Sequence, residues 1–342
     1  MKSKRILYIG NNLTKKTKYN STIIVLSSLL KNEGYSVKVS SDKTNKILRL
    51  LDMCFSVFRY KSDYILIDTF STVNFYYAFV ISQLARLLNV KYIPILHGGN
   101  LPYRLKKNKK LSNLIFNNSY KNIAPSNYLK TAFEAEGYST EFIPNILEIE
   151  NYNLKKRKKI APKLWLVRAC KEMDNPTIAI AVLFELKKTH PNATLCMVGP
   201  FVDNSYNDTL KLVSQLKLED SVEFTNVLLK EDWHKKSEDF DIFINTTNFD
   251  NTPVSVMEAM ALGLPEMSTN VGGLHFLINN KVDGILVENK NSTKEELAET
   301  VNRVEDFRAK TQDGYVDLYI GLSKLSTEKQ WPKLAKQLNK FI

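Results

Sequence analysis

A polar loop that runs into an apolar helix near residue 250 carries the residues best suited to bind an anion. Thr252 is a natural helix N-cap, and Pro253 fits the first helical position, where its missing N–H costs nothing. The next amides, of Val254 and Ser255, then point out of the helix start, where the positive end of the helix dipole favours a phosphate. The sequence therefore predicts a phosphate site at this helix start.

Glu258 follows on the same predicted helix, five residues after Pro253, which places it about 8 Å further along the axis. A carboxylate there could accept two hydrogen bonds from a ribose diol while the helix start holds a diphosphate. The alternative is a surface glutamate, but the other residues from Val256 to Ala261 are all apolar, which argues against a solvated face.

Two further motifs could carry chemistry. His97 ends a predicted strand and precedes Gly98 and Gly99, which places it for ligand contact, although a lone histidine is more often structural. Asp239 and Asp241 form a DxD pattern, but an apolar strand follows at once. We interpret the pair as a helix-to-strand junction and predict no metal site.

Strand-like and helix-like segments alternate along the whole chain, which predicts parallel, doubly wound α/β sheets. The predicted strands are 6–10, 35–39, 64–67, 92–96, 123–124, 142–145, 164–167, 195–198, 222–224, 242–245 and 284–287. The predicted helices are 21–31, 73–88, 126–137, 176–189, 209–216 and 253–262. A charged stretch over 147–163 is predicted to link two Rossmann-like halves that face each other across a cleft. Such sheets bind ligands at the carboxyl ends of their strands.

Composition excludes several classes of protein. The 342 residues are 44% apolar, which excludes a disordered or collagen-like chain. The three cysteines exclude a disulfide scaffold and a CxxC zinc site, and they fit a reducing cytoplasm. The first apolar run is too short for a signal peptide, and no stretch is apolar for long enough to span a membrane.

The positive charge is concentrated in the first half of the chain. Residues 1–160 hold 27 Lys+Arg and 10 Asp+Glu, whereas the remainder is net negative and the whole chain is +12. The densest basic clusters are 104–110 and 155–159. Solubility explains such an excess, and so does peripheral binding to the anionic inner face of the cell membrane. Nucleic acid is not expected as a partner, because neither cluster lies in a nucleic-acid-binding module.

The segment around Glu258 resembles a known family. Asp250 and Glu258 are separated by seven residues, and Gly272 and Gly273 follow. This is similar to the E-x7-E signature and Gly-Gly turn of the retaining glycosyltransferases of family 4, which have the GT-B fold. The resemblance implies that Glu258 holds the ribose of a nucleotide sugar and that Asp250 lies near the transferred sugar. Aspartate replaces the family's first glutamate, which shortens its reach by one methylene.

Arg168, directly after a predicted strand, resembles the family's diphosphate-binding arginine, a task that suits a guanidinium with several donors. Met173 stands where the family has a companion lysine. Either Lys171 or helix-start amides at the Asn175–Pro176 segment are expected to replace it.

The resemblance implies further contacts in both halves. In the first half, His97 would face the donor sugar, and Gly10 would let the backbone approach the diphosphate or the acceptor. Ser126 and Asn145 match family positions at the rim, with a helix cap and a turn residue as the alternatives. In the second half, the resemblance adds the loop residues Asn251, Thr252, Pro253, Val254 and Ser255 to the donor contacts.

The implied organisation is an acceptor-side domain over 1–155, a nucleotide-sugar domain over 156–325, and a C-terminal helix over 326–342 that could pack back on the first domain. The implied activity is metal-independent, retaining transfer from a UDP- or GDP-sugar, without a cofactor. The acceptor would be a saccharide or polyprenyl-diphosphate-linked saccharide in bacterial cell-surface polysaccharide synthesis. The alternatives are a catalytically silent sugar-nucleotide-binding partner and, less favoured by the Glu258 segment, an epimerase of the same fold. The sequence does not specify the base, sugar, acceptor or oligomeric state.

Overall fold

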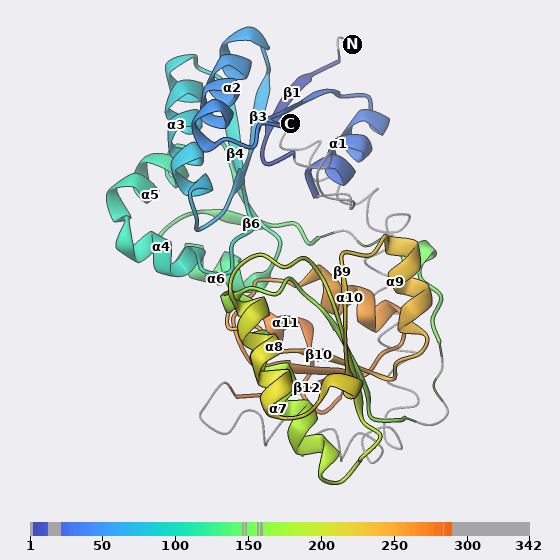
Figure 1. Ribbon diagram of the computed structural model, residues 1–342. Helices are drawn as coiled ribbons and strands as arrows, with labels where there is room; N and C mark the ends of the chain where they lie inside the picture. Colours follow the sequence, from blue (N-terminus) through green and yellow to red (C-terminus); the bar gives the residue numbers. More distant parts are fainter. Residues whose placement is uncertain are drawn as a thin grey trace. The chain divides into compact units, whose positions relative to one another are not determined.

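The chain forms two compact units that divide between Pro144 and Asn145 (Figure 1). The computed structural model describes residues 3–12, 22–145, 147, 149–155, 157, 160–282 and 284–288. The division comes before the predicted boundary at residue 155 because Leu147, Ile149 and Tyr152 are buried in the core of the second unit. The predicted C-terminal helix over 326–342 lies outside the described residues.

The first unit contains a six-stranded sheet in which every pairing is parallel, in the order β2-β1-β3-β4-β5-β6. Its strands are β1 (Arg5–Ile9), β2 (Ser36–Ser40), β3 (Tyr64–Thr69), β4 (Lys91–Leu96), β5 (Asn122–Ala124) and β6 (Thr140–Phe142). The strand order reverses between β1 and β3, so the carboxyl ends of these two strands flank the position where such sheets bind ligands.

Six helices connect these strands: α1 (Thr22–Asn32), α2 (Lys46–Arg59), α3 (Asn74–Leu87), α4 (Leu101–Lys107), α5 (Lys109–Phe116) and α6 (Asn127–Ala135). α2 packs on α3, and α3 packs on α5 (Figure 1). Ser126 caps α6 by accepting a hydrogen bond from the Leu129 amide at 3.1 Å, which confirms the helix-cap alternative. None of α2, α4 and α5 was predicted from the sequence.

The second unit also contains a six-stranded sheet in which every pairing is parallel, in the order β12-β11-β10-β7-β8-β9. Its strands are β7 (Lys163–Val167), β8 (Thr194–Val198), β9 (Val222–Asn226), β10 (Ile242–Asn245), β11 (Glu266–Thr269) and β12 (Gly284–Val287). Numbered within the unit, this is the 3-2-1-4-5-6 order of dinucleotide-binding sheets, and its reversal lies between β7 and β10. The predicted α/β class with two parallel sheets is confirmed.

The helices of the second unit are α7 (Pro176–Lys187), α8 (Ser205–Gln215), α9 (Lys230–Ser237), α10 (Val254–Ala261) and α11 (Leu274–Leu277). Short 3₁₀ turns lie at Ile149–Asn151, Glu172–Asp174 and Glu219–Ser221. Two buried apolar clusters, one centred on α7 and the other on α10, hold the sheet between them. None of the helices in the described part of the chain is both long and apolar enough to cross a membrane.

Candidate functional site

The carboxyl ends of β7, β10 and β11 bring three polar side chains together in the second unit. Arg168 directly follows β7, Asn245 is the last residue of β10, and Ser268 pairs with Asn245 in the register of β10 and β11. The Arg168 Nε–H donates to Asn245 Oδ1 at 3.2 Å, and the Asn245 amide donates to Ser268 Oγ at 2.9 Å. Asn245 and Ser268 are fully buried, so they hold the guanidinium at the switch point of the sheet.

Arg168 also forms an ion pair with Asp250. Its Nη2 group bonds Asp250 Oδ2, and the other oxygen of this carboxylate accepts the Asn251 amide at 2.7 Å. The two side chains are only 18% and 15% exposed. The guanidinium Nη1 group has no hydrogen-bond partner among the described residues, so Arg168 keeps donors for an anionic ligand while Asp250 sets its orientation.

The Gly272–Gly273 turn lies directly against the backbone of Asp250. Gly272 has φ +56°, and a Cβ placed on it would come within 1.8 Å of the Asp250 carbonyl oxygen. The Gly273 amide donates to that oxygen at 3.1 Å. The turn therefore requires glycine at 272 for both its dihedral angle and its close approach, and it fixes the loop that carries Asp250.

The start of α10 differs from the prediction. The helix begins at Val254, and Pro253 is its N-cap in an extended conformation, so the prediction of Thr252 as N-cap and Pro253 as first helical residue is wrong by one position. Proline has no side-chain oxygen to cap the helix, and among the described residues no side chain is seen to cap its first amides. The amides of Val254 and Ser255 lie in this first turn, and the Ser255 hydroxyl is buried with no partner among the described residues.

Glu258 is held by side chains from two other segments. The Tyr152 hydroxyl donates to Glu258 Oε1 at 2.6 Å, and Lys230 Nζ lies 3.1 Å from the same oxygen. Lys230 Nζ also lies 4.9 Å from the centre of the Tyr152 ring, and this ring is tilted against the His234 ring with centres 4.6 Å apart. The glutamate is 13% exposed, which excludes a solvated surface position. Both partners use Oε1, so Oε2 is able to accept further hydrogen bonds.

Sequence reasoning missed Tyr152 and Lys230. Tyr152 lies in the stretch that was predicted to be a linker, and Lys230 begins α9, a helix that was not predicted.

Burial and the nearby Lys230 ammonium lower the pKa of His234 to about 4, so this ring is neutral at pH 7.

Lys171 does not bond the Arg168–Asp250 pair. Its Nζ lies 3.3 Å from Asp174 Oδ2, and Asp174 is itself buried. Asn175 adopts a left-handed conformation at φ 48° and is the N-cap of α7, which begins at Pro176. Of the two expected substitutes for the missing lysine, the helix start at Asn175 makes no side-chain cap hydrogen bond, whereas Lys171 pairs with a buried aspartate.

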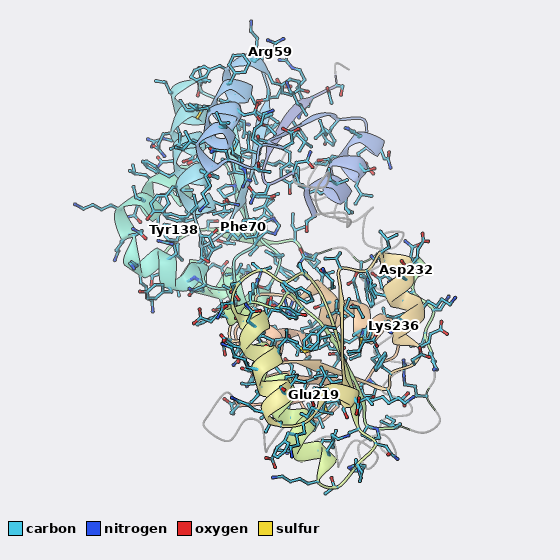
Figure 2. The ribbon with its side chains drawn as sticks, viewed as in Figure 1. Arg59, Phe70, Tyr138, Glu219, Asp232 and Lys236 are labelled. Atoms are coloured by element: carbon cyan, nitrogen blue, oxygen red, sulfur yellow. The ribbon has the colours of Figure 1, made fainter. Side chains whose placement is uncertain are left out.

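In the first unit, His97 belongs to a cluster around Asp68. His97 Nε2 and the Tyr8 hydroxyl each lie 2.9 Å from Asp68 Oδ1. A carboxylate can only accept, so Nε2 carries the proton and Nδ1 is left for another partner. Phe70, labelled in Figure 2, lies directly after β3 and stacks on the imidazole with ring centres 5.2 Å apart. Neither Asp68, which bonds His97, nor Tyr8, which bonds Asp68, was predicted from the sequence.

Gly10 lies against the same carboxylate. A Cβ on Gly10 would come within 2.3 Å of Asp68 Oδ2 and 2.8 Å of Ile23. The glycine follows β1 and Asp68 lies in β3, so both flank the reversal in strand order of the first sheet. Gly10 is thus required to leave room for a buried side chain of the cluster.

The DxD pattern has a structural role in the described chain. Asp241 directly precedes β10, accepts the Ala161 amide at 3.0 Å and pairs with Arg157 at 3.3 Å. This confirms the interpretation as a helix-to-strand junction. Arg157 is 9% exposed and donates to the Phe240 and Gly263 carbonyls, so this member of the basic 155–159 cluster is part of the core. Among the described residues, no three His, Cys, Asp or Glu side chains are grouped as metal ligands.

Comparison with solved structures identifies the architecture. The Anabaena protein HepE, in a complex with UDP and glucose, is 17% identical over 98% of this chain and 99% of its own, with a TM-score of 0.73. Sucrose-phosphate synthase from Thermosynechococcus elongatus is 14% identical over 98% and 99%, with a TM-score of 0.79. The lipopolysaccharide outer core galactosyltransferase WaaB is 15% identical over 99% and 100%, with a TM-score of 0.69.

The chain has the GT-B fold. In addition, residues 149–313 match the family described as glycosyl transferases group 1. The matched range begins within the second unit and contains Arg168, Asp250 and Glu258, so the family match and the candidate site fall on the same part of this GT-B protein.

Proposed function

We propose that this GT-B protein is a retaining glycosyltransferase of family 4 that takes its sugar from a nucleotide diphosphate. The observation that carries the proposal is the pair of anchors at the switch point of the second sheet. Arg168, paired with Asp250 in the loop before α10, keeps free guanidinium donors, and Glu258 presents one carboxylate oxygen on that helix. The anchors suit a diphosphate and a ribose, and the family match over 149–313 supports the same activity.

UDP is the nucleotide that we propose first. HepE, which shares the fold, is described in complexes with UDP and with UDP-glucose. In the proposed complex the diphosphate meets Arg168 and the amides of Val254 and Ser255, while Glu258 Oε2 accepts from the ribose hydroxyls. These positive groups would meet the charge of the diphosphate, so we propose transfer without a metal ion or cofactor.

The proposed transfer replaces one bond at the anomeric carbon. The bond from this carbon to the diphosphate oxygen breaks, and its electron pair leaves with UDP. The acceptor hydroxyl oxygen forms the new bond on the same face, so the anomeric configuration is retained, and its proton passes to the departing diphosphate oxygen. Arg168 stabilises the charge that develops on that oxygen, which is the largest catalytic contribution we assign to the protein.

Asp250 and His97 have proposed roles near the sugar. Asp250 orients Arg168 through their ion pair, and His97, held by Asp68 through Nε2, would present Nδ1 to a sugar hydroxyl. We propose a saccharide or lipid-linked saccharide as the acceptor, in bacterial cell-surface polysaccharide synthesis. WaaB, described as a lipopolysaccharide outer core galactosyltransferase, shares the fold and supports this context.

A specific observation favours a second candidate function. Asp250 replaces the family's glutamate, and both its oxygens are engaged by Arg168 and the Asn251 amide. Met173 also replaces the companion lysine. With these two replacements, the protein could bind a nucleotide sugar without transferring its sugar. It would then act as a catalytically silent partner of another enzyme.

A thermal-shift screen against UDP, GDP, ADP and their sugars, with and without Mg²⁺, tests the donor site. A ligand at 100 times its Kd adds about 2.7 kcal/mol to the free energy of unfolding, so we expect a clear shift with UDP that Mg²⁺ does not change. Release of UDP from UDP-sugars then separates the two functions, because the silent partner binds without turnover. The absence of a shift with every nucleotide would contradict both.

A further inference from the structure

Five large apolar side chains lie exposed along one face of α2 in the first unit. They are between 54% and 72% exposed, and they are Ile47, Leu48, Leu51, Phe55 and Phe58. Their spacing follows the helical repeat, while Met53 and Val57 on the opposite face are buried in the core. We call these five residues the α2 stripe. Single exposed apolar residues are ordinary, but a contiguous stripe on one helix marks an interaction surface.

α3 packs on α2, α5 packs on α3, and α4 packs on α5; this row of helices, which we call the α2–α5 face, carries further exposed aromatic, aliphatic and basic side chains. α3 packs on α2 and exposes Tyr76 and Leu87 at 45% and 77%, and α4 exposes Tyr103 at 59%. Between Thr69 and Phe133 the sequence contains no acidic residue, and α2 contains one, Asp52. This part of the molecule therefore combines exposed apolar groups with an almost uncompensated positive charge.

The basic residues of this surface lack acidic partners. Lys106, Lys107, Lys109 and Lys110 are exposed on α4 and α5, and within the described chain none of them lies within 4.0 Å of a carboxylate. Arg59, labelled in Figure 2, is exposed at the C-terminal end of α2. Basic groups that no internal carboxylate neutralises are free to attract an external anion.

We propose that the α2–α5 face binds an anionic lipid bilayer, with α2 lying in the membrane interface and its stripe inserted among the acyl chains. α2 has 14 residues and is about 21 Å long, which is too short to span a bilayer, and its buried face ties it to the sheet. A second copy of the chain fits less well, because pairing would bring two strongly basic faces together. Anionic headgroups complement that charge. This inference goes beyond the proposed sugar transfer and does not depend on it.

Flotation with vesicles tests the proposal on the full chain. Vesicles of neutral phosphatidylcholine are compared with vesicles that contain phosphatidylglycerol, each at low and high salt. We expect at least tenfold stronger binding to the anionic vesicles, weakened by salt. The double variant Leu51→Ser/Phe55→Ser should lose at least tenfold in binding, and the quadruple change of Lys106, Lys107, Lys109 and Lys110 to Gln should lose the preference for anionic lipid.

The control variant is Leu210→Ser, which removes an apolar side chain that is 38% exposed on α8 in the second unit and should leave vesicle binding unchanged. Melting temperatures without ligand, measured on every variant, confirm that each is folded, and UDP-induced thermal shifts report on the donor site separately. The proposal is overturned if the wild-type protein does not bind vesicles, or if the Leu51→Ser/Phe55→Ser variant binds them as strongly as the wild type. It is also overturned if the protein is a dimer in solution that this variant dissociates.

Discussion

Arg168 and Asp250 form an ion pair across 82 residues of sequence, and this pair joins the end of β7 to the loop before α10. Asn245 holds the other side of the same guanidinium. In the proposed complex, Arg168 supplies the positive charge that meets the diphosphate, and Asp250 orients it. The strand order of the second sheet explains why they meet, because β7 and β10 are neighbours at its reversal.

Replacing Arg168 with Ala should lower kcat/KM at least 100-fold, because the diphosphate loses its main charge-stabilising donor. Arg168→Lys should not restore it, since an ammonium cannot bond Asn245, Asp250 and a phosphate in the planar geometry of the guanidinium. Release of UDP from a UDP-sugar measures the effect, and circular dichroism confirms the fold. A well-folded Arg168→Ala protein with near-normal rates would remove Arg168 from the mechanism.

Asp68 should act on catalysis through His97. We expect Asp68→Asn to lower kcat/KM about tenfold, because the imidazole loses its fixed orientation and tautomer. In a His97→Ala background the same change should have almost no effect, which a purely structural role would not produce. Tyr8→Phe, which removes the other hydrogen bond to Asp68, is the matched control with a smaller expected loss. Additive effects of Asp68→Asn and His97→Ala on kcat/KM would contradict the assignment.

Gly272→Ala should destabilise the protein more than Gly137→Ala. Both glycines have positive φ, +56° and +87°, but an added Cβ meets the Asp250 carbonyl at 1.8 Å at position 272 and nothing within 4 Å at position 137. The change at 137 isolates the dihedral cost of about 1 kcal/mol, and the change at 272 adds the displacement of the Asp250 loop. Urea unfolding and UDP binding measure both effects. Equal losses of stability, with UDP binding intact, would show that the close approach has no consequence.

As the pH is lowered from 6.5 to about 4, the free energy of unfolding should decrease because of His234. Burial and Lys230 lower its pKa from 6.5 to about 4, so in this window the unfolded chain binds a proton that the folded chain does not. We expect His234→Asn to reduce the loss of stability between pH 7 and pH 5 by about 1 kcal/mol, allowing for solvent screening. His275→Asn, at an exposed site, is the control in urea unfolding. An unchanged pH dependence in His234→Asn would contradict this account.

The sequence predicted the parallel α/β architecture and most strands, because buried apolar runs and helix caps are local signals. Ser126 is an example, since its capping of α6 follows from its residue type and place. α2 was missed because apolar residues occupy both its buried and its exposed face, which hides the single stripe expected of a surface helix. The start of α10 was misplaced by one residue because threonine followed by proline is the usual pair of residue types at the N-cap and first helical position, whereas this helix begins after Pro253.

The partners within the site could not be predicted from local patterns. Tyr152 and Glu258 are 106 residues apart, and their hydrogen bond depends on a segment that packs into the second core instead of linking two domains. Asp68 has no motif around it that separates it from an ordinary strand residue. Such contacts follow from strand order and packing, which the sequence specifies only through the complete fold.

The central claim is that Glu258 binds the ribose of the donor, and a comparison of UDP with 2′-deoxy-UDP tests it most directly. Titration calorimetry on the wild type should show at least tenfold weaker binding of the deoxynucleotide, because Glu258 Oε2 loses a charge-assisted hydrogen bond of about 1.5–3 kcal/mol. Glu258→Ala should bind both nucleotides equally and more weakly. If the wild type does not discriminate between them, or if the variant discriminates as strongly as the wild type, Glu258 does not contact the ribose and the donor site is misassigned.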